Sequence, residues 1–365
     1  MIPLSLAQLA EVVGGSEPCE PPDDAQVTSV VIDSRRVRPG ALFVPLPGEH
    51  VDGHDYVTAS LEQGAAGYLW AQDRGLAPDP GRAVIVDDPA DALLGLGWWL
   101  RDEVDPVVVA VTGSVGKTTT KDLIAAAVGA GARTVAGEGS HNNELGVPLT
   151  CARLQMDTEV LVVEIGARGL GHIAQLAGPL RPDIAVVTAV GASHLEMLGD
   201  IETVARAKAE LVQVLSAEGL AVLNVDDQRV AAMARQAPGE VLGYGEKEGA
   251  DWQAVSVRHD ALARHRFTVR HPAEADRERP QSQDELEVEL SIPGRHNVGN
   301  ALAALAVAAR CGVELRVAAS ALATAAVSAW RMEILSSPHG VTVLNDAYNA
   351  NPESMRAALA TLASL

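Results

Sequence analysis

The sequence is poor in cysteine, aromatic residues and positive charge, and it has no long hydrophobic run. Its 3 cysteines are scattered and odd in number, which fits neither a disulfide framework nor a zinc knuckle. The sequence has 28 basic and 48 acidic residues. The resulting net charge of −20 argues against a nucleic-acid partner. The apolar runs are shorter than the roughly 20 residues of a membrane span, and the N-terminus lacks a signal-peptide pattern. We therefore expect a soluble, cytoplasmic protein that is not exported.

The rest of the composition predicts a packed α/β protein of two or three domains. Hydrophobic residues make up 47% of the 365 residues, with 33 glycines and 20 prolines between them. Residues 1–103 mix short strand-like segments with turns, which predicts a small N-terminal α/β domain. Residues 104–331 alternate apolar runs with helical patterns, typical of a doubly wound, mostly parallel sheet. The predicted strands are 27–32, 41–46, 83–86, 107–111, 160–163, 184–190, 220–225, 254–257 and 286–292, with an exposed loop at 272–286 and helices at 117–128, 173–177, 201–215 and 297–309.

Residues 332–365 predict only one strand, one turn and one helix. The strand is expected at 341–344 and the helix at 353–362. One such unit cannot bury its own apolar face. We expect that it docks onto the preceding domain, or that it is the truncated start of a third, Rossmann-like α/β domain in a longer protein.

A glycine-rich loop at residues 112–120, Thr-Gly-Ser-Val-Gly-Lys-Thr-Thr-Thr, carries the strongest chemical signal. It follows an apolar strand and opens a helix, so that backbone N–H groups and the helix N-terminus can face phosphate. Lys117 is expected to be exposed and to reach the terminal phosphates, and Thr118 to bind Mg²⁺. The full phosphate-loop pattern would need glycine at Val111. The alternative is an ordinary glycine turn with a solvated lysine.

Polar residues beyond later strands extend this predicted nucleotide site. Glu164 directly follows the strand 160–163, where ligands of an open parallel sheet gather. A single glutamate at the end of a strand is more often a turn or cap residue. Because Glu164 belongs to the same predicted sheet as the phosphate loop, we expect it to be a Mg²⁺ ligand instead. His194 follows the strand ending at Val190, where a lone histidine is more often a surface residue. Lys208, on the next helix, is by residue type a solvated lysine.

Together these motifs resemble the Mur ligase family over nearly the whole chain. The loop 112–120 is similar to the family's ATP loop, which has the same shortened glycine pattern. The segment 142–148 resembles the substrate loop of the members that add D-alanyl-D-alanine, and the segment 346–355 is the most discriminating piece. Further similar segments are 33–35, 39–44, 52–54, 164–168, 192–196, 205–210, 293–297 and 300–302.

The resemblance implies a role for each candidate site residue. The ATP phosphates would be held by Gly113, Ser114, Val115, Gly116, Lys117, Thr118 and Thr119. The ligands of Mg²⁺ would be Thr118, Glu164, His194 and Lys208, the last as a carbamate formed with CO₂. The other ATP contacts would be Asn300 at adenine, Asp346 at ribose and Arg331. The catalytic group would be Lys117, His194, Lys208 and Arg331, and the substrate-binding residues Ser34, Arg35, Asn142, Asn143 and Arg168.

The implied activity joins D-alanyl-D-alanine to UDP-N-acetylmuramoyl-tripeptide in peptidoglycan synthesis, through an acyl phosphate and with release of ADP. We expect the protein to be a monomer that binds these two substrates, ATP and Mg²⁺. In the family the third domain closes over ATP, so residues 1–365 alone are expected to bind the UDP-substrate but to ligate slowly. The alternatives are a sister Mur or folylpolyglutamate-type ligase, against which 142–148 and 348–352 argue, and a truncated nucleotide-binding module without turnover.

Overall fold

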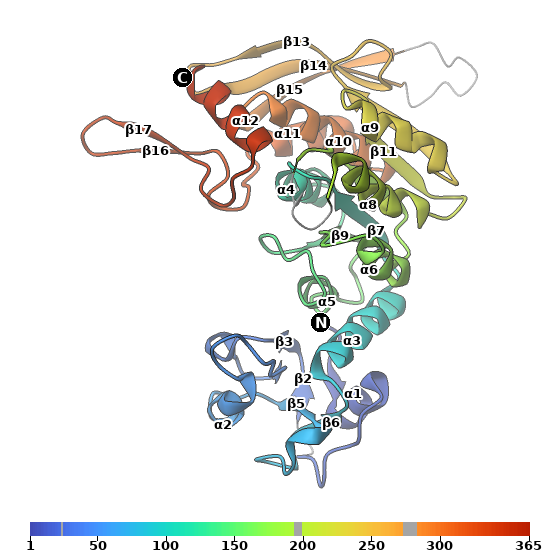
Figure 1. Ribbon diagram of the computed structural model, residues 1–365, viewed down its shortest axis with the longest axis vertical. Helices are drawn as coiled ribbons and strands as arrows, with labels where there is room; N and C mark the ends of the chain where they lie inside the picture. The colour runs from blue at the N-terminus through green and yellow to red at the C-terminus, as the bar shows by residue number, and fades with distance from the viewer. Residues whose placement is uncertain (23–24, 193–198, 273–282) are drawn as a thin grey trace. The chain divides into compact units, whose positions relative to one another are not determined.

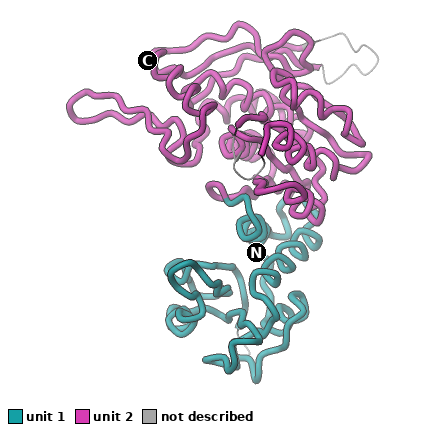
Figure 2. The backbone as a smooth tube through the Cα atoms, viewed as in Figure 1, with its two compact units in different colours: residues 1–106, 141–158 teal, residues 107–140, 159–365 magenta. Residues whose placement is uncertain are grey.

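The structure is a computed structural model that describes residues 1–22, 25–192, 199–272 and 283–365 (Figure 1). The described chain forms two compact units, which Figure 2 colours separately. The first unit contains residues 1–106 and 141–158, and the second contains residues 107–140 and 159–365. The chain therefore leaves the second unit after Ser140 and returns to it after Thr158. The domain boundaries expected at residues 103 and 331 stay a prediction.

A parallel sheet lies at the centre of the first unit. Its strand order is β3 (Ser29–Val31), β4 (Ala41–Phe43), β5 (Gly67–Ala71) and β6 (Ala83–Val86). The sequence pattern does not predict β5, all five residues of which are buried. The predicted strand at 27–32 is two strands in the structure, since β2 (Gln26–Val27) pairs with β1 (Leu4–Ser5) instead. The helices are α1 (Leu6–Val13), α2 (Val57–Glu62), α3 (Pro89–Val104) and α5 (Gly146–Cys151).

Asp52 caps the short helix Gly53–Tyr56 in the first unit. Its carboxylate accepts a hydrogen bond from the His54 amide at 3.0 Å, contacts the His54 ring Nδ1 at 2.7 Å, and pairs with Arg74. The hydrogen bond from the His54 amide, followed by that from its ring, lowers the pKa of Asp52 to about 2. Asp52 is therefore ionised throughout the ordinary pH range and joins two segments of the unit.

Replacing Asp52 by asparagine is expected to lower the free energy of unfolding at pH 7 by about 1 kcal/mol, the usual cost of a weakened N-cap. The carboxyl pKa is lower in the folded state than in the unfolded chain. Its contribution is therefore complete above about pH 4 and is lost as the pH falls towards 2. Urea unfolding at pH 7 and pH 3 measures the change, with the exposed Asp73→Asn as the control. An equal Asp52→Asn effect at both pH values would contradict this account.

Across the described residues nine strands form the sheet of the second unit, in the order β15-β14-β13-β12-β11-β10-β7-β9-β8. The strands from β8 to β13 pair in parallel, whereas β13–β14 and β14–β15 are antiparallel. The prediction of a mostly parallel sheet is therefore confirmed. The strands are β7 (Val107–Thr112), β8 (Thr134–Ala136), β9 (Val160–Glu164), β10 (Ile184–Val187), β11 (Leu220–Asn224), β12 (Glu240–Gly245), β13 (Trp252–His259), β14 (Arg264–Pro272) and β15 (Gln283–Pro293).

Helices cover both faces of this sheet. Val109 and Val111 of β7 share a hydrophobic core with the helices α4 and α10, and the intervening Val108 and Ala110 are also fully buried. Because successive strand residues point to opposite faces, neither face of β7 is open to solvent after its exposed first residue, Val107. None of the helices in the described ranges is long and apolar enough to cross a membrane. The helices are α4 (Lys117–Gly129), α6 (His172–Leu180), α8 (Ile201–Gln213), α9 (Gln228–Ala232), α10 (His296–Arg310) and α11 (Leu315–Leu322).

The antiparallel end of the sheet differs from the sequence prediction. β14 lies between β13 and β15, although the pattern predicts no strand there. Its residues alternate between buried Phe267 and Val269 and exposed arginines such as Arg266, so it lacks the apolar run that marks the other strands. The loop expected at 272–286 is shorter in the structure because β15 begins at Gln283, and its residues 273–282 lie outside the described ranges.

The last residues of the chain belong to the second unit. The predicted strand and helix are present as β17 (Thr342–Asn345) and α12 (Pro352–Leu362), and β16 (Glu333–Ser336) pairs antiparallel with β17. Asn351 and Ser354 form a capping box at the start of α12. Glu353 in the first turn accepts a 3.2 Å hydrogen bond from the amide of Ala192. This bond joins α12 to the residues that follow β10.

Candidate active site

The phosphate loop joins the end of β7 to the start of α4, as its sequence predicts. Gly113 has a φ of 148°, and a Cβ there would collide with Oγ1 of Thr188. That hydroxyl donates a 2.6 Å hydrogen bond to the Val115 carbonyl, and the Ser114 amide donates to the Ala189 carbonyl at 2.7 Å. The residues after β10 therefore hold the loop in shape.

The N-terminus of α4 directly follows this loop. Gly116 precedes the helix with a φ of 82°, and within the described residues no side chain caps it. The N–H groups of the first turn and the helix dipole therefore favour an anion. Lys117 is half-buried, which corrects the expectation of an exposed side chain. Burial lowers the pKa of Lys117, and the nearby carboxylate of Glu164 opposes this shift.

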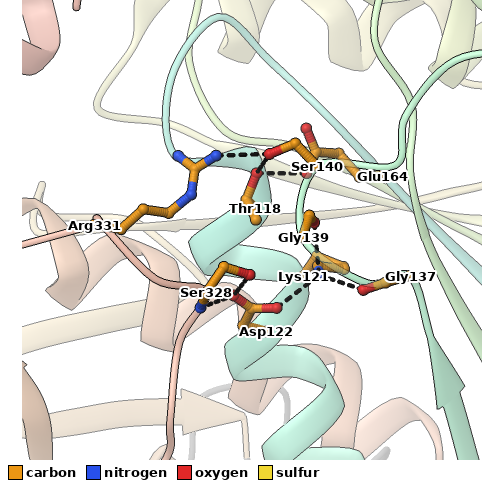
Figure 3. A network of polar contacts seen from close by, with 9 residues as sticks. All are labelled: Thr118, Lys121, Asp122, Gly137, Gly139, Ser140, Glu164, Ser328 and Arg331. Atoms are coloured by element: carbon orange, nitrogen blue, oxygen red, sulfur yellow. Dashed lines mark hydrogen bonds and ion pairs between the residues drawn. The ribbon is translucent and has the colours of Figure 1, made fainter. Parts of the chain in front are cut away.

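Thr118 and Glu164 meet where α4 begins and β9 ends (Figure 3). Oγ1 of Thr118 donates a 2.6 Å hydrogen bond to Oε2 of Glu164 and lies 3.0 Å from Oγ of Ser140. Hydroxyl and carboxylate oxygens are the kind of ligand that Mg²⁺ prefers. Among the described residues no three His, Cys, Asp or Glu side chains form a group that could hold a metal ion.

Lys208 is buried on α8, with 2% of its surface exposed, rather than solvated as its residue type suggests. Burial, followed by the positive charge of Lys117, lowers the pKa of Lys208 to about 7, while Glu164 and Glu210 oppose the shift. The amino group of Lys208 therefore interacts electrostatically with Lys117 of the phosphate loop and with Glu164. A substantial share of this amine is neutral at pH 7, and the neutral amine is the form that reacts with CO₂.

A cavity of about 300 Å³ lies beside the phosphate loop, at the small end of the range for ligand sites. Asn300 is one of its lining residues and is held in place by hydrogen bonds from Thr120 at 3.0 Å and to Asn297 at 2.8 Å. The cavity brings together six of the residues predicted to contact ATP, namely Val115, Gly116, Thr119, Asn300, Arg331 and Asp346.

Arg331 reaches from the cavity lining towards Thr118 (Figure 3). Its Nη2 donates a 2.7 Å hydrogen bond to Oγ of Ser140, and its guanidinium lies 4.1 Å from the ring centre of Tyr348. Both neighbours of Arg331 have left-handed backbones, with φ of 63° at Trp330 and 53° at Met332. The Met332 amide donates to Asp346 at 3.1 Å, so the carboxylate of Asp346 supports this strained segment.

Three family models match this sequence. The Mur ligase middle domain matches residues 111–308, more than half of the chain. The chain belongs to the Mur ligase family. The model of the family's catalytic domain matches residues 26–92, and that of the glutamate ligase domain matches residues 330–365. As a Mur ligase it is an ATP-dependent, ADP-forming ligase of a magnesium-dependent family.

Named relatives of this Mur ligase cover its whole length. The UDP-N-acetylmuramoyl-tripeptide--D-alanyl-D-alanine ligase of Mycobacterium tuberculosis is 42% identical over 100% of this chain and 74% of its own length, and that of Bacillus subtilis is 34% identical over 100% and 76%. MurF from Acinetobacter baumannii matches with a TM-score of 0.84 and 29% identity, over 100% of this chain and 77% of its own. MurF from Thermotoga maritima in complex with ADP has a TM-score of 0.77 and 27% identity, over 94% and 76%.

The substrate-binding residues predicted for this Mur ligase lie in both units. Ser34, Arg35, Asn142 and Asn143 are in the first unit, and Arg168 is in the second. Arg35 is 87% exposed, with its guanidinium paired to Asp33, so a bound anion would compete with that carboxylate. Asn143 uses Oδ1 to accept from the amides of residues 145 and 146 at the start of α5, which gives it a structural role as well.

Two groups of residues at the site were not predicted from the sequence. Ser140 and Thr188 contact the phosphate loop but belong to no predicted site, although Ser140 lies two residues before the segment 142–148 and this position could have indicated it. The acidic cavity residues Asp226 and Glu246 carry no motif that would have indicated them. His194, predicted as a metal ligand, lies outside the described residues.

Proposed function

We propose that this chain joins D-alanyl-D-alanine to UDP-N-acetylmuramoyl-tripeptide, with release of ADP and phosphate. The observation that carries the proposal is the contact between Thr118 and Glu164 beside a phosphate loop, with the buried Lys208 in its electrostatic neighbourhood. The relatives of this name, similar over the whole chain, support the choice of substrates. We also propose that the reaction takes place in the cytoplasm, in a monomer, and supplies the pentapeptide precursor of peptidoglycan.

The residues around the cavity suit a nucleoside triphosphate. The N–H groups at the start of α4 and the charge of Lys117 would hold the phosphates, and Asn300 and Asp346 would contact the nucleoside. Thr118 and Glu164 would hold Mg²⁺, which neutralises phosphate charge when bound. We keep His194 as a further proposed ligand.

The proposed reaction has two steps. A carboxylate oxygen of the tripeptide attacks the γ-phosphorus in line, the bond to the bridging oxygen of ADP breaks, and an acyl phosphate forms. The amine of D-alanyl-D-alanine then attacks the acyl carbon, the bond to phosphate breaks, and the amine loses a proton. The carboxylate and the triphosphate are both negative and repel each other. The positive charges of Lys117 and Arg331 would reduce this repulsion.

We propose further that Lys208 carries a carbamate. Its ammonium first loses a proton; the neutral amine then attacks CO₂ and loses a second proton, which leaves an anion with two oxygen donors. An anion at this position relieves the repulsion between Lys208 and Lys117. Its oxygen atoms would add to the hydroxyl and carboxylate oxygens of Thr118 and Glu164 as ligands of the kind that Mg²⁺ prefers.

The test of the function is incubation with UDP-N-acetylmuramoyl-tripeptide, ATP, Mg²⁺ and D-alanyl-D-alanine, with the product identified by mass spectrometry, which detects slow turnover. The pentapeptide is expected only when all four are present. Parallel reactions replace the dipeptide with single amino acids, or the UDP-substrate with a folate and glutamate. Product in one of those reactions alone would assign a sister activity, and nucleotide binding without any product would leave a binding module.

A further inference from the structure

The second turn of α4 carries a lysine that the phosphate chemistry does not use. Lys121 lies three residues after Thr118, on the same side of the helix, and is only 1% exposed. Its Nζ donates to the carbonyls of Gly137 at 2.5 Å and Gly139 at 3.1 Å, and pairs with Oδ1 of Asp122 at 2.7 Å (Figure 3). An ammonium has three donors, so each has a partner here.

This buried ammonium fastens the backbone of the segment 137–140. Glycines at two of its positions have no side chain with which to fix the loop, and their carbonyls are bound by Lys121. The Gly137 amide also donates to Val162 of β9 at 3.1 Å. Because burying a charge is costly even in an ion pair, stability alone is a weak reason for a lysine here. The geometry of the loop is the stronger reason.

The loop ends at the hydroxyl that joins two proposed ATP-site residues. Oγ of Ser140 lies 3.0 Å from Oγ1 of Thr118 and accepts from Nη2 of Arg331 at 2.7 Å. A shift of the loop therefore moves Ser140 away from both partners. Lys121 controls that position from the next turn of the helix that bears Thr118.

Asp122, the ion-pair partner of Lys121, binds the segment that leads to Arg331. Its side chain is 12% exposed, and Oδ2 accepts from both the amide and the hydroxyl of Ser328, at 2.7 Å and 2.8 Å. Ser328 lies three residues before Arg331, in the segment with the left-handed residues Trp330 and Met332. Asp122 therefore anchors one side of this segment, as Asp346 does on the other.

We propose that Lys121 and Asp122 are positioning residues of the ligation reaction. Their ion pair couples the segment 137–140 to the segment 328–331, so that Ser140 and Arg331 converge on Thr118. Neither residue lines the cavity; Lys121 acts mainly through Ser140, and Asp122 mainly through Arg331. The inference rests on the proposed function for its catalytic part, whereas the anchoring of the two segments can be measured without turnover.

The kinetic test uses Asp122→Asn and Ser328→Ala. Asp122→Asn is expected to lower kcat roughly 10- to 100-fold, because a misplacement of about 1 Å costs up to about 10²-fold, while KM for the UDP-substrate stays unchanged. Ser328→Ala removes only one of two hydrogen bonds to Asp122 and is expected to cost less. The control is Glu285→Gln, which breaks the exposed ion pair with Arg270 and leaves kcat unchanged.

A double-mutant cycle shows whether Asp122 acts through Arg331. In an Arg331→Ala background, Asp122→Asn is expected to lower kcat by less than about threefold, because the group that it positions is gone. A merely structural role would give the full loss again in that background. The full loss there, or an unchanged kcat in Asp122→Asn alone, would overturn the proposal.

Hydrogen exchange tests the anchoring of the two segments without any need for turnover. Asp122→Asn is expected to speed amide exchange at 328–331, and Lys121→Gln at 137–140, with exchange in β10 unchanged. Unchanged exchange in both segments would overturn the anchoring. If the wild-type chain forms no pentapeptide, the proposed function and the catalytic part of this inference both fail, and faster exchange would then support the anchoring alone.

Discussion

Replacing Lys117 by alanine is expected to lower ATP-dependent ligation by about 10³-fold while the chain remains folded. Lys117 is the first residue of α4, directly after the phosphate loop, and its ammonium interacts electrostatically with the carboxylate of Glu164. It would offset charge that develops on the transferred phosphate. Its loss removes a point charge that water cannot replace in a half-buried position. Release of inorganic phosphate in the presence of both substrates measures the effect.

The stability of this variant separates chemistry from folding. Burial already disfavours the charged form of Lys117, as its lowered pKa shows, so its removal is not expected to reduce the thermal unfolding temperature. Arg229→Ala is the matched control, since it removes a cation from an exposed ion pair with Glu202 and is expected to ligate normally. Phosphate release near the wild-type rate in Lys117→Ala would refute the phosphate-loop assignment.

Replacing Lys208 by alanine is expected to cost roughly 10²- to 10³-fold in ligation rate, and added short-chain carboxylic acids are expected to restore part of it. The buried side chain leaves a space near Glu164 and Lys117, and a carboxylate there supplies the oxygen donors of the lost carbamate. The rate is measured against acetate or propionate concentration. Chloride at equal ionic strength is the control for screening.

Two comparisons make this rescue specific. Lys117→Ala is expected to gain nothing from carboxylic acids, because it lacks a cation rather than an anion. In the wild-type chain the pKa of Lys208, lowered by burial to about 7, predicts a share of neutral amine that takes up CO₂ at neutral pH. An unmodified Lys208 observed beside a fully occupied metal site would rule the carbamate out.

Local patterns determined the parts of the site that are contiguous in the chain. The segment 112–120 predicts the strand, loop and helix because glycine conformations and helix starts depend on near neighbours. Alternation of apolar and helical segments predicts the parallel sheet in the same way, but it misses β5, β8 and β12. It also misses β14, where exposed arginines interrupt the apolar residues. Residues whose role depends on these elements alone, such as Lys117, could be named from the sequence.

The tertiary structure decided which distant residues meet and which charges are buried. Lys208 has the sequence surroundings of an exposed helix residue, and only packing of α8 in the second unit gives it a pKa of about 7. Ser140 and Ser328 bind the first turns of α4 from other segments of the chain, Arg331 in turn binds Ser140, and no local pattern specifies those contacts. The physical reason is that hydrogen bonds and desolvation depend on distance in space, whereas composition and periodicity record only distance along the chain.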